Sequence, residues 1–196
     1  MKRLLDIVAS GFGLLVMSPV FLFLAVWIKL DSKGSVFYRQ VRVGRGNKDF
    51  RLFKFRSMRI GSDKKGLITV SSHDPRVTRS GYFIRKYKLD EFPQLINVFM
   101  GDMSLVGPRP EVRKYVDMYT PEQMHILDVK PGMTSLASIC YRNENELLEK
   151  VEDPDQYYVD VIMQDKLAID LEYVQKASCG SDIKLIIRTF WEIVTK

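Results

Sequence analysis

An uncharged apolar stretch near the start of the chain constrains the fold more than any other feature of the sequence. It reads GFGLLVMSPVFLFLAVWI, from Gly11 to Ile28, and contains 18 residues without a charge. As an α-helix it would be about 27 Å long, close to the ~30 Å hydrocarbon thickness of a bilayer. We therefore expect a membrane helix within residues 1–30, followed by one domain over residues 31–196.

Ser18 and Pro19 interrupt this stretch near its middle. A proline inside a helix lacks a backbone donor and clashes with the carbonyl four residues earlier, here that of Leu15. The sequence thus predicts a kink, with the Ser18 hydroxyl helping to satisfy the freed backbone group. A kinked helix that spans the bilayer and a re-entrant helix that returns to the same face both fit these residues. A buried core helix of a soluble protein is the remaining alternative.

Positive charge is concentrated in one part of the chain. Residues 29–88 contain 17 Lys or Arg against 4 Asp or Glu, a net charge of +13, whereas residues 89–196 contain 11 against 19, a net charge of −8. This asymmetry favours an anionic partner for the first half, such as a membrane surface, a phosphate-bearing substrate or a nucleic acid. The two cysteines and two histidines lack the number and spacing of a disulfide framework or a zinc site.

The rest of the chain predicts an α+β fold that is mainly helical. SVFYRQVRVG and DFRLFKFRSM flank a GRGN turn, a pattern typical of a β-hairpin. The stretch from Gly61 to Pro75 has the composition of a loop. Helical periodicity is expected from about Thr78, over Leu89–Met100, from Thr120 to about Leu127, from Asp153 to about Lys176 and from Ser181 to the end.

The last of these helices is amphipathic. Its cations include Lys184 and Arg188, and its apolar residues are Ile183, Ile186, Ile187, Phe190, Trp191 and Val194. Such a pattern is found in helices that lie at a membrane interface, and ordinary core packing explains it equally well.

The adjacent carboxylates Asp90 and Glu91 are the leading candidates for chemistry. Asp90 stands just before a helical pattern with Pro93 in its first turn, so it could simply cap that helix. The same position, near free backbone donors, keeps a carboxylate ionised and also suits a nucleophile or a metal ligand. The residues by themselves allow both interpretations.

Arginines nearby favour a phosphate-bearing substrate. Arg109 lies between two prolines in GDMSLVGPRPE, which restricts its guanidinium and suits bidentate contact with phosphate, although a structural turn is the alternative. Arg85 and Arg142 add further cations. Phosphoryl transfer needs an in-line nucleophile and charge neutralisation by a divalent metal and arginines.

Several runs of the chain resemble the bacterial sugar transferases, the monotopic phosphoglycosyl transferases that begin lipid-linked glycan assembly. The matching runs are KRLLDIVAS, YRQVRVGRG, FRLFKFRSMR, HDPRVTRSGYFIRKYKLDEFPQLINVFMGDMSLVGPRPE and KPGMTS. The resemblance implies an enzyme that transfers a sugar 1-phosphate from a UDP-sugar to polyprenyl (undecaprenyl) phosphate and releases UMP. It also implies a covalent phosphosugar intermediate and ping-pong kinetics.

The resemblance also implies roles for individual residues. Asp90 matches the nucleophile, which also contacts Mg²⁺, and Glu91 matches its partner in proton handling or metal positioning. Ser18 and Pro19 match a break that makes the membrane helix re-entrant, so a monotopic protein on the cytoplasmic face of the bacterial inner membrane is expected. The residues expected to bind substrate or phosphate are Lys54, Arg85, Arg109, Pro110 and Arg142.

The implied partners are a UDP-sugar, polyprenyl phosphate and membrane lipid, with a homodimer allowed and no nucleic acid expected. Ser135, Ser138 and Tyr141 replace the Gly, Gln and Gly that the family often has before its Arg-Asn pair, here Arg142 and Asn143. This departure bears on substrate preference or on the conformation of that loop. A non-catalytic membrane scaffold and a membrane-anchored nucleic-acid-binding module are the alternatives.

Overall fold

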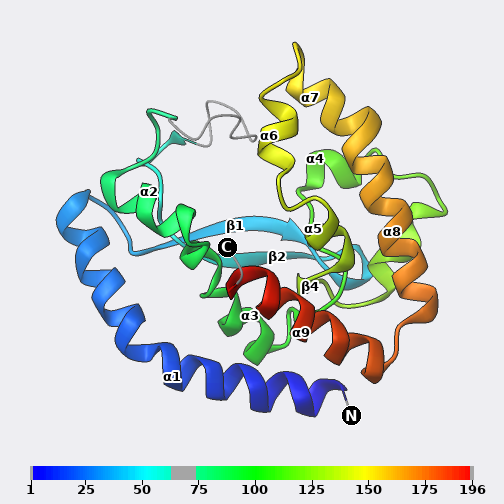
Figure 1. Cartoon of the computed structure of the whole chain (residues 1–196), viewed down its shortest axis with the longest axis horizontal. Coiled ribbons are helices and arrows are strands. Elements are labelled where there is room, and N and C mark those ends of the chain that lie inside the picture. Colours follow the sequence, from blue (N-terminus) through cyan, green and yellow to red (C-terminus); the bar gives the residue numbers. More distant parts are fainter. Residues whose placement is uncertain (1, 63–73, 195–196) are drawn as a thin grey trace.

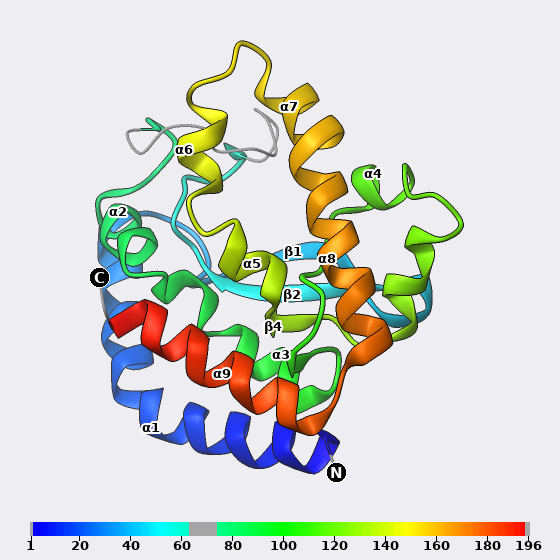
Figure 2. The same cartoon turned by 45° about the vertical axis from the view of Figure 1, so that its right-hand side comes forward.

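The computed structural model describes residues 2–62 and 74–194, and a two-stranded hairpin lies at its centre (Figure 1). Helix α3 (Gln94–Met100) contacts both the hairpin and the long N-terminal helix α1 (Lys2–Asp31), so it lies between them. The elements after α3 build a second side of the molecule, which includes the two long helices α8 (Met163–Lys176) and α9 (Cys179–Val194) (Figure 2). Most of the predicted loop from Gly61 to Pro75 lies outside the described residues.

The hairpin confirms the prediction. Strands β1 (Phe37–Val43) and β2 (Asp49–Phe55) pair antiparallel, with Phe37 opposite Phe55 and Val43 opposite Asp49. The turn between them contains the short 3-10 helix η1 (Arg45–Asn47), in which Gly46 and Asn47 have φ values of 68° and 60°. Glycine and asparagine tolerate this left-handed backbone, which explains the GRGN turn.

Helix α1 is continuous through Pro19, and its axis changes direction along its length (Figure 1). The Ser18 hydroxyl donates a 2.8 Å hydrogen bond to the carbonyl of Leu15, the group that cannot bond to Pro19. The predicted kink and the predicted role of Ser18 are therefore confirmed.

Both ends of α1 pack onto the same body. Near its start, the buried Asp6 carboxylate accepts hydrogen bonds from the Ser104 hydroxyl at 3.0 Å and from the backbone N–H of Leu105 at 2.9 Å. Near its end, Leu24 and Ile28 are buried in one cluster with Phe55 and Ile84. Asp6 and Ile28 thus fix the two ends of α1 to the domain that follows it.

The middle of α1 is largely exposed. Within the described residues it is the one helix that is long and apolar enough to cross a membrane, judged by length and composition, and 11% of its apolar window is buried. A helix so little buried is not the core helix of a soluble protein, so that alternative is wrong.

The remaining elements are short. They are α2 (Arg79–Lys86), η3 (Leu89–Glu91), β3 (Ser104–Val106), α4 (Arg113–Val116), η4 (Gln123–Asp128), β4 (Gly132–Thr134), α5 (Leu136–Cys140), α6 (Glu144–Leu148), α7 (Pro154–Tyr157), the π-helical η5 (Tyr158–Ile162) and α9 (Cys179–Val194).

Strands β3 and β4 form a two-stranded parallel sheet that the sequence did not predict. Gly107, directly after β3, and Gly132, the first residue of β4, let the two backbones meet, since a Cβ on Gly132 would lie 2.1 Å from the backbone nitrogen of Gly107. No side chain would fit at that contact, and the sheet is too short to give a strand pattern.

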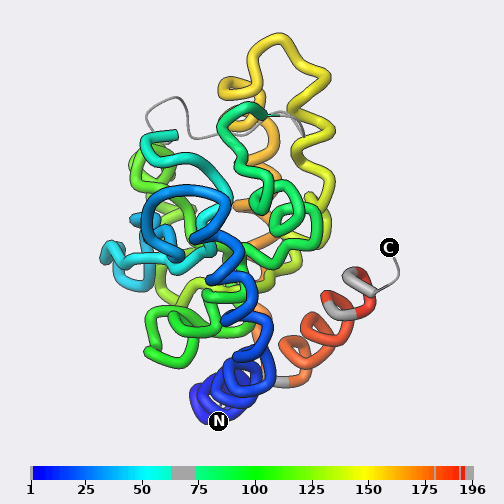
Figure 3. The backbone as a smooth tube through the Cα atoms, turned by 90° about the vertical axis from the view of Figure 1, so that its left-hand side faces the viewer, coloured from blue at the N-terminus to red at the C-terminus, as the bar shows by residue number. Residues whose placement is uncertain are grey.

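Several predicted helices have different boundaries. The helix expected from Thr120 is the 3-10 helix η4, which begins at Gln123, and the last helix begins at Cys179 instead of Ser181. The start at Asp153 is confirmed, because its side chain accepts a 3.0 Å hydrogen bond from the N–H of Gln156. Figure 3 shows α9 projecting away from the N-terminal end of α1.

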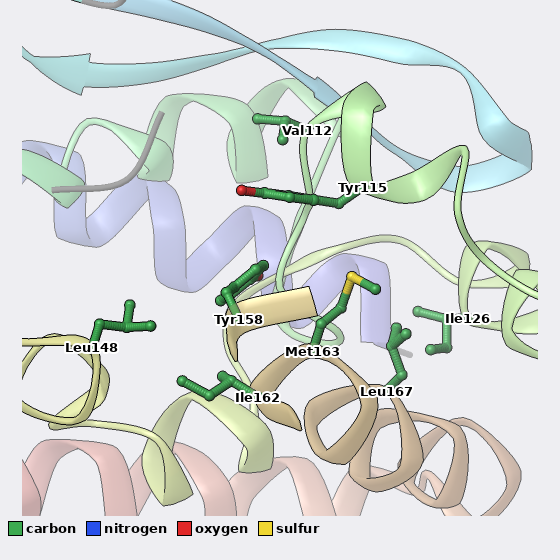
Figure 4. Close-up of a cluster of buried hydrophobic side chains, with 8 residues drawn as sticks. All are labelled: Val112, Tyr115, Ile126, Leu148, Tyr158, Ile162, Met163 and Leu167. Carbon is green, nitrogen blue, oxygen red and sulfur yellow. The ribbon is translucent and has the colours of Figure 1, made fainter. Parts of the chain in front are cut away.

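The largest buried cluster lies between α4, η4 and the α7–α8 segment (Figure 4). The rings of Tyr115 and Tyr158 pack with centroids 4.9 Å apart inside it. Its members are Val112, Tyr115, Ile126, Leu148, Tyr158, Ile162, Met163 and Leu167. This core anchors the segment that follows Pro110.

Candidate active site

Asp90 and Glu91 lie in the short 3-10 helix η3, between α2 and α3. Lys88 precedes them in the left-handed conformation, with φ 55°, and α3 begins only at Gln94. The residue at the N-cap of α3 is Pro93, and no side chain caps either helix. The N-cap interpretation of Asp90 and the single helix expected over Leu89–Met100 are both wrong.

Glu91 is held by two cations. Its Oε1 atom accepts a hydrogen bond from Nζ of Lys54 on β2 at 3.2 Å and another from Nη2 of Arg109. Burial opposes the ionisation of Glu91, but the charges of Arg109 and Lys54 outweigh it and hold the pKa of that carboxyl well below its usual range. Glu91 is therefore an anion with a fixed orientation.

Asp90 has the opposite electrostatic balance. Burial raises the pKa of Asp90, and the adjacent negative charge of Glu91 adds to that rise. The positive charges of Lys54 and Arg85 oppose the rise without cancelling it. Asp90 is thus a partly desolvated carboxylate beside several cations. A carboxylate that has lost part of its water shell is more reactive toward an electrophile, and nearby cations favour an anionic substrate.

The loop that carries Arg109 is held on both sides. The Pro108 carbonyl accepts a 2.8 Å hydrogen bond from the N–H of Gly132, and the Pro110 carbonyl accepts one of 3.0 Å from Arg42. These bonds restrict the backbone around Arg109 in addition to the two prolines. The guanidinium can therefore keep its position on Glu91.

Sequence reasoning missed a second polar network behind this loop. The Glu111 carboxylate accepts a 3.0 Å hydrogen bond from Arg42 on β1 and a 2.6 Å hydrogen bond from the hydroxyl of Tyr158 in η5. Burial raises the pKa of Tyr158 far above its ordinary value, and Glu111 adds to that rise, so the hydroxyl stays a donor. The position of Glu111 directly after Pro110 could have marked it as a candidate site residue. Nothing in the sequence indicated that its partner is Tyr158, 47 residues further along.

Arg142 lies in a different place from the other predicted residues. Its Nη1 atom is 2.5 Å from Oε2 of Glu192 on α9, and the two residues line an open hollow of about 480 Å³ together with Ile139, Cys140 and Asn143. The structure therefore brings together Lys54, Arg85, Asp90, Glu91 and Arg109, with Pro110 beside them. The other predicted residues lie outside this group: Arg142 is bonded to Glu192 on α9, and Ser18 and Pro19 lie on α1.

The three departures before Arg142 have local structural roles. The Ser135 hydroxyl caps α5 by accepting a 3.0 Å hydrogen bond from the N–H of Ser138, and it donates one of 3.0 Å to the Ser138 hydroxyl. The Tyr141 hydroxyl donates a 2.6 Å hydrogen bond to Asp165 on α8. These residues define the conformation of the loop that ends at Arg142.

A metal ion would have few protein ligands here. Among residues 2–62 and 74–194 there is no group of three or more His, Cys, Asp or Glu placed to hold one. Mg²⁺ is commonly bound by one or two carboxylates together with substrate phosphates and water. Because Glu91 already pairs with Lys54 and Arg109, Asp90 is the carboxylate that fits this kind of site.

A desolvated aspartate among cations is a site suited to phosphoryl chemistry, and sequence comparison agrees with this class. The model of the family described as bacterial sugar transferase matches residues 1–196. The chain therefore belongs to the bacterial sugar transferase family.

Three curated relatives illustrate what the chain is similar to. The chain is 39% identical over 99% of its length to the UDP-N-acetylgalactosamine-undecaprenyl-phosphate N-acetylgalactosaminephosphotransferase of Aeromonas hydrophila, covering 44% of that protein. It is similar to UDP-glucose:undecaprenyl-phosphate glucose-1-phosphate transferases of Escherichia coli (38% identity, 98% of this chain, 40% of the relative) and Caulobacter vibrioides (36%, 99% and 70%). The chain thus spans less than half the length of the first two.

Proposed function

We propose that this protein is a phosphoglycosyl transferase that moves a sugar 1-phosphate from a UDP-sugar to polyprenyl phosphate. The observation that carries the proposal is the partly desolvated Asp90 beside Glu91, with Lys54, Arg85 and Arg109 supplying positive charge. The names of the relatives support the same substrates.

The reaction proceeds in two displacements at one phosphorus atom. A carboxylate oxygen of Asp90 attacks the phosphorus that bears the sugar, an acyl-phosphate bond forms, and the bond to UMP breaks so that UMP leaves with the electron pair. A phosphate oxygen of polyprenyl phosphate then attacks the same phosphorus and displaces the carboxylate. The product is a polyprenyl-diphosphate-linked sugar, and Asp90 returns to its original state.

The surrounding residues supply orientation and charge. Arg109 and Lys54 keep Glu91 ionised and fixed, and Arg85 and Lys54 offer positive charge to phosphoryl oxygens. When Mg²⁺ is bound, Asp90 and the phosphates of the donor hold it, and it neutralises charge on the diphosphate. Arg142, with Asn143 in the hollow beside α5, binds the phosphate or nucleotide part of the donor.

The exposed apolar surface of α1 supports a membrane location. In this proposal α1 is re-entrant: it enters one leaflet and returns to the cytoplasmic face of the bacterial inner membrane. The contacts of Asp6 and Ile28, which attach the two ends of α1 to the same domain, support this topology. The strongly exposed apolar residues along it are Leu4, Val8, Phe12, Leu15, Val16, Leu22, Phe23, Val26 and Leu30. This topology places the polyprenyl phosphate headgroup at the depth of the domain that carries Asp90.

Helix α9 extends this surface as an interfacial helix. Ile183, Ile186, Ile187 and Trp191 are exposed, so core packing does not explain these four, and Lys184 and Arg188 offer charge to anionic headgroups.

The decisive experiment follows the covalent intermediate. The full chain, purified in detergent, is incubated with a panel of UDP-sugars, and intact-protein mass and UMP release are measured with and without polyprenyl phosphate. Wild type gains the mass of one phosphosugar, and Asp90→Asn gains none, whereas the exposed Asp117→Asn behaves as wild type. Unchanged UMP release in Asp90→Asn, or an adduct on another residue, would refute the nucleophile. If substitution of neither Asp90 nor Glu91 changed UMP release or the protein mass, the result would favour a non-catalytic membrane scaffold.

A further inference from the structure

Four aromatic rings form a continuous row that runs from α1 onto α2. Phe23 and Trp27 of α1 have ring centroids 5.9 Å apart, and Trp27 packs on Phe83 of α2 at 5.3 Å. Phe83 in turn packs on Tyr87, with centroids 4.7 Å apart. Helix α2 lies beside the C-terminal part of α1, so the row crosses directly from one helix to the other (Figure 1). We refer to these four rings as the aromatic ladder.

The aromatic ladder keeps much of its surface exposed. Phe23 is 63% exposed, Phe83 42% and Tyr87 53%. Contiguous apolar surface that stays exposed is typical of a binding site for an apolar partner. The ladder begins on the exposed apolar surface of α1, so a partner can reach it from the membrane.

The other end of the ladder lies next to the turn that carries Asp90. Tyr87 is the C-cap residue of α2 and stands three residues before Asp90. Leu89, the direct neighbour of Asp90, packs against the same buried cluster of α1 and α2 as Trp27 does. Asp90 itself keeps some accessible surface. A chain that follows the ladder from α1 therefore arrives at the turn that carries Asp90.

Positive charge gathers at this end of the ladder. Arg85 and Lys86 occupy the last turn of α2, and Lys88 follows Tyr87. Nζ of Lys86 lies 5.6 Å from the centroid of the Tyr87 ring. An apolar row that ends among cations complements a lipid with a long apolar chain and an anionic headgroup.

We propose that the aromatic ladder is the docking surface for the polyprenyl chain of the acceptor, and that it brings the acceptor phosphate to Asp90. The isoprenoid chain lies along the exposed ring faces and contacts them with its methyl groups and double bonds. An aromatic belt at a membrane interface gathers rings at headgroup depth, whereas the ladder leads along two helices to one turn. The inference rests on the proposed function, because it takes polyprenyl phosphate as the acceptor.

Alanine at position 83 or 87 separates acceptor binding from donor binding. Both side chains are about half exposed, so the melting temperatures of Phe83→Ala and Tyr87→Ala in detergent stay close to that of wild type. The KM for polyprenyl phosphate, measured by UMP release at saturating UDP-sugar, rises about 10-fold in each variant, because each loses a ring that contacts the chain. The KM for UDP-sugar, measured at saturating acceptor, is unchanged.

Phe99 provides a matched control. Its ring is 48% exposed and also lies beside α1, since a Cβ on Gly11 would come 3.3 Å from it, but it is not part of the ladder. Phe99→Ala therefore keeps the wild-type KM for polyprenyl phosphate. An equal rise of this KM in Phe99→Ala and Phe83→Ala would mean that exposed rings act only by holding the protein at the membrane, and would overturn the proposal.

Trp27 reports occupation of the ladder without turnover. The chain has two tryptophans, so Trp191→Phe leaves Trp27 as the single one. The full chain is placed in nanodiscs that contain brominated phosphatidylcholine, which quenches a tryptophan in contact with lipid. Polyprenyl phosphate at low mole fraction displaces this lipid and restores the Trp27 emission in a saturable manner. Phosphatidic acid, which also has a phosphate monoester headgroup, does not restore it at the same mole fraction.

Each outcome decides the proposal. Equal recovery with both lipids would mean that any anionic lipid covers the ladder, and no recovery with polyprenyl phosphate would mean that its chain lies elsewhere. Either result would overturn the proposal, and so would a wild-type acceptor KM in both alanine variants. Absence of UMP release from wild type with every UDP-sugar would instead refute the proposed function. The Trp27 emission would then still decide whether the ladder binds polyprenyl phosphate.

Discussion

Nζ of Lys54 lies 3.2 Å from Oε1 of Glu91, and this ion pair joins the central hairpin to the turn that carries Asp90. Lys54 lies on β2 and Glu91 in η3, and these two elements contact each other. Lys54 therefore acts on both carboxylates: it opposes the effect of burial on the pKa of Asp90 and helps Arg109 to keep Glu91 ionised.

Replacing Lys54 by glutamine changes the pH profile as well as the rate. We expect kcat/KM to fall by on the order of 10²-fold, because a fixed charge at the site is lost. Since Lys54 lowers the pKa of Asp90 and Glu91 against the effect of burial, its loss raises both, and the acid limb of the profile moves to higher pH. Lys48→Gln, at an exposed cation of the same hairpin, leaves the profile unchanged. An unmoved acid limb in Lys54→Gln would contradict this account.

Asp6 attaches α1 to the domain. Asp6→Leu leaves the Ser104 hydroxyl and the Leu105 N–H without their acceptor, so the free energy of unfolding falls by about 1–3 kcal/mol. Asp6→Asn retains an acceptor oxygen and loses less. Chemical denaturation in detergent measures both variants, and equal stability of Asp6→Leu and wild type would show that this contact does not hold α1.

Pro19 decides the topology of α1 if the helix is re-entrant. With alanine at position 19, an N–H can bond to the carbonyl of Leu15, and a straight helix of 30 residues is about 45 Å long, enough to cross the bilayer. Cysteines introduced near Lys2 and Lys33, in a chain lacking Cys140 and Cys179, report the sidedness of each end through an impermeant thiol reagent. In wild type neither end reacts from outside, whereas in Pro19→Ala the N-terminal end does. Labelling of the wild-type N-terminus from outside would exclude the re-entrant topology.

Glu192 competes with substrate for Arg142 if that arginine binds the donor. Glu192→Gln removes the ion pair across the hollow, so the KM for UDP-sugar falls severalfold, while Arg142→Gln raises it. Glu172→Gln, which breaks an exposed pair with Lys176, serves as control. A KM that responds to neither Glu192 nor Arg142 would place donor binding elsewhere.

Asp170 makes stability depend on pH. It is 5% exposed, its Oδ1 has no hydrogen-bond partner in the described part of the chain, and burial raises its pKa to about 7, with Lys166 opposing. The native state therefore holds a proton that the unfolded chain releases near pH 4, and the free energy of unfolding falls as pH rises from about 4 to 7, by on the order of 4 kcal/mol. Above about pH 7 the contribution of Asp170 to the free energy of unfolding is fully lost and no longer changes with pH.

Asp170→Asn removes this contribution. The melting temperature of Asp170→Asn, measured relative to wild type from pH 4 to 8, rises with pH, whereas the same comparison for the exposed Asp160→Asn stays flat. A flat difference for Asp170→Asn would mean that its carboxyl ionises normally in the native protein.

Local patterns in the sequence were enough for the features that depend on near neighbours. The hairpin follows from two alternating runs around a glycine turn, and the kink of α1 follows from a proline whose lost hydrogen bond is four residues away. The helix start at Asp153 follows from a cap and a proline in sequence. Each of these is decided by contacts within a few residues, so composition and spacing are sufficient to predict it.

The features that failed or were missed depend on distant parts of the chain. The sequence around Asp90 resembles a helix N-cap, which is why that role was predicted. In the structure, Lys88 has a left-handed backbone and Glu91 forms ion pairs with Lys54 and Arg109, so Asp90 lies in the short 3-10 helix η3 instead. The parallel pairing of β3 with β4 and the bond between Glu111 and Tyr158 join segments that no periodicity connects.

By itself, the sequence determined the apolar helix, the charge asymmetry, the family and the identity of the carboxylate pair. Only the tertiary structure decided that Lys54 and Arg109 converge on Glu91 and that Arg142 pairs with α9 instead. The physical reason is that desolvation and charge pairing depend on which surfaces the folded chain brings together. A residue's own sequence neighbourhood does not contain that information.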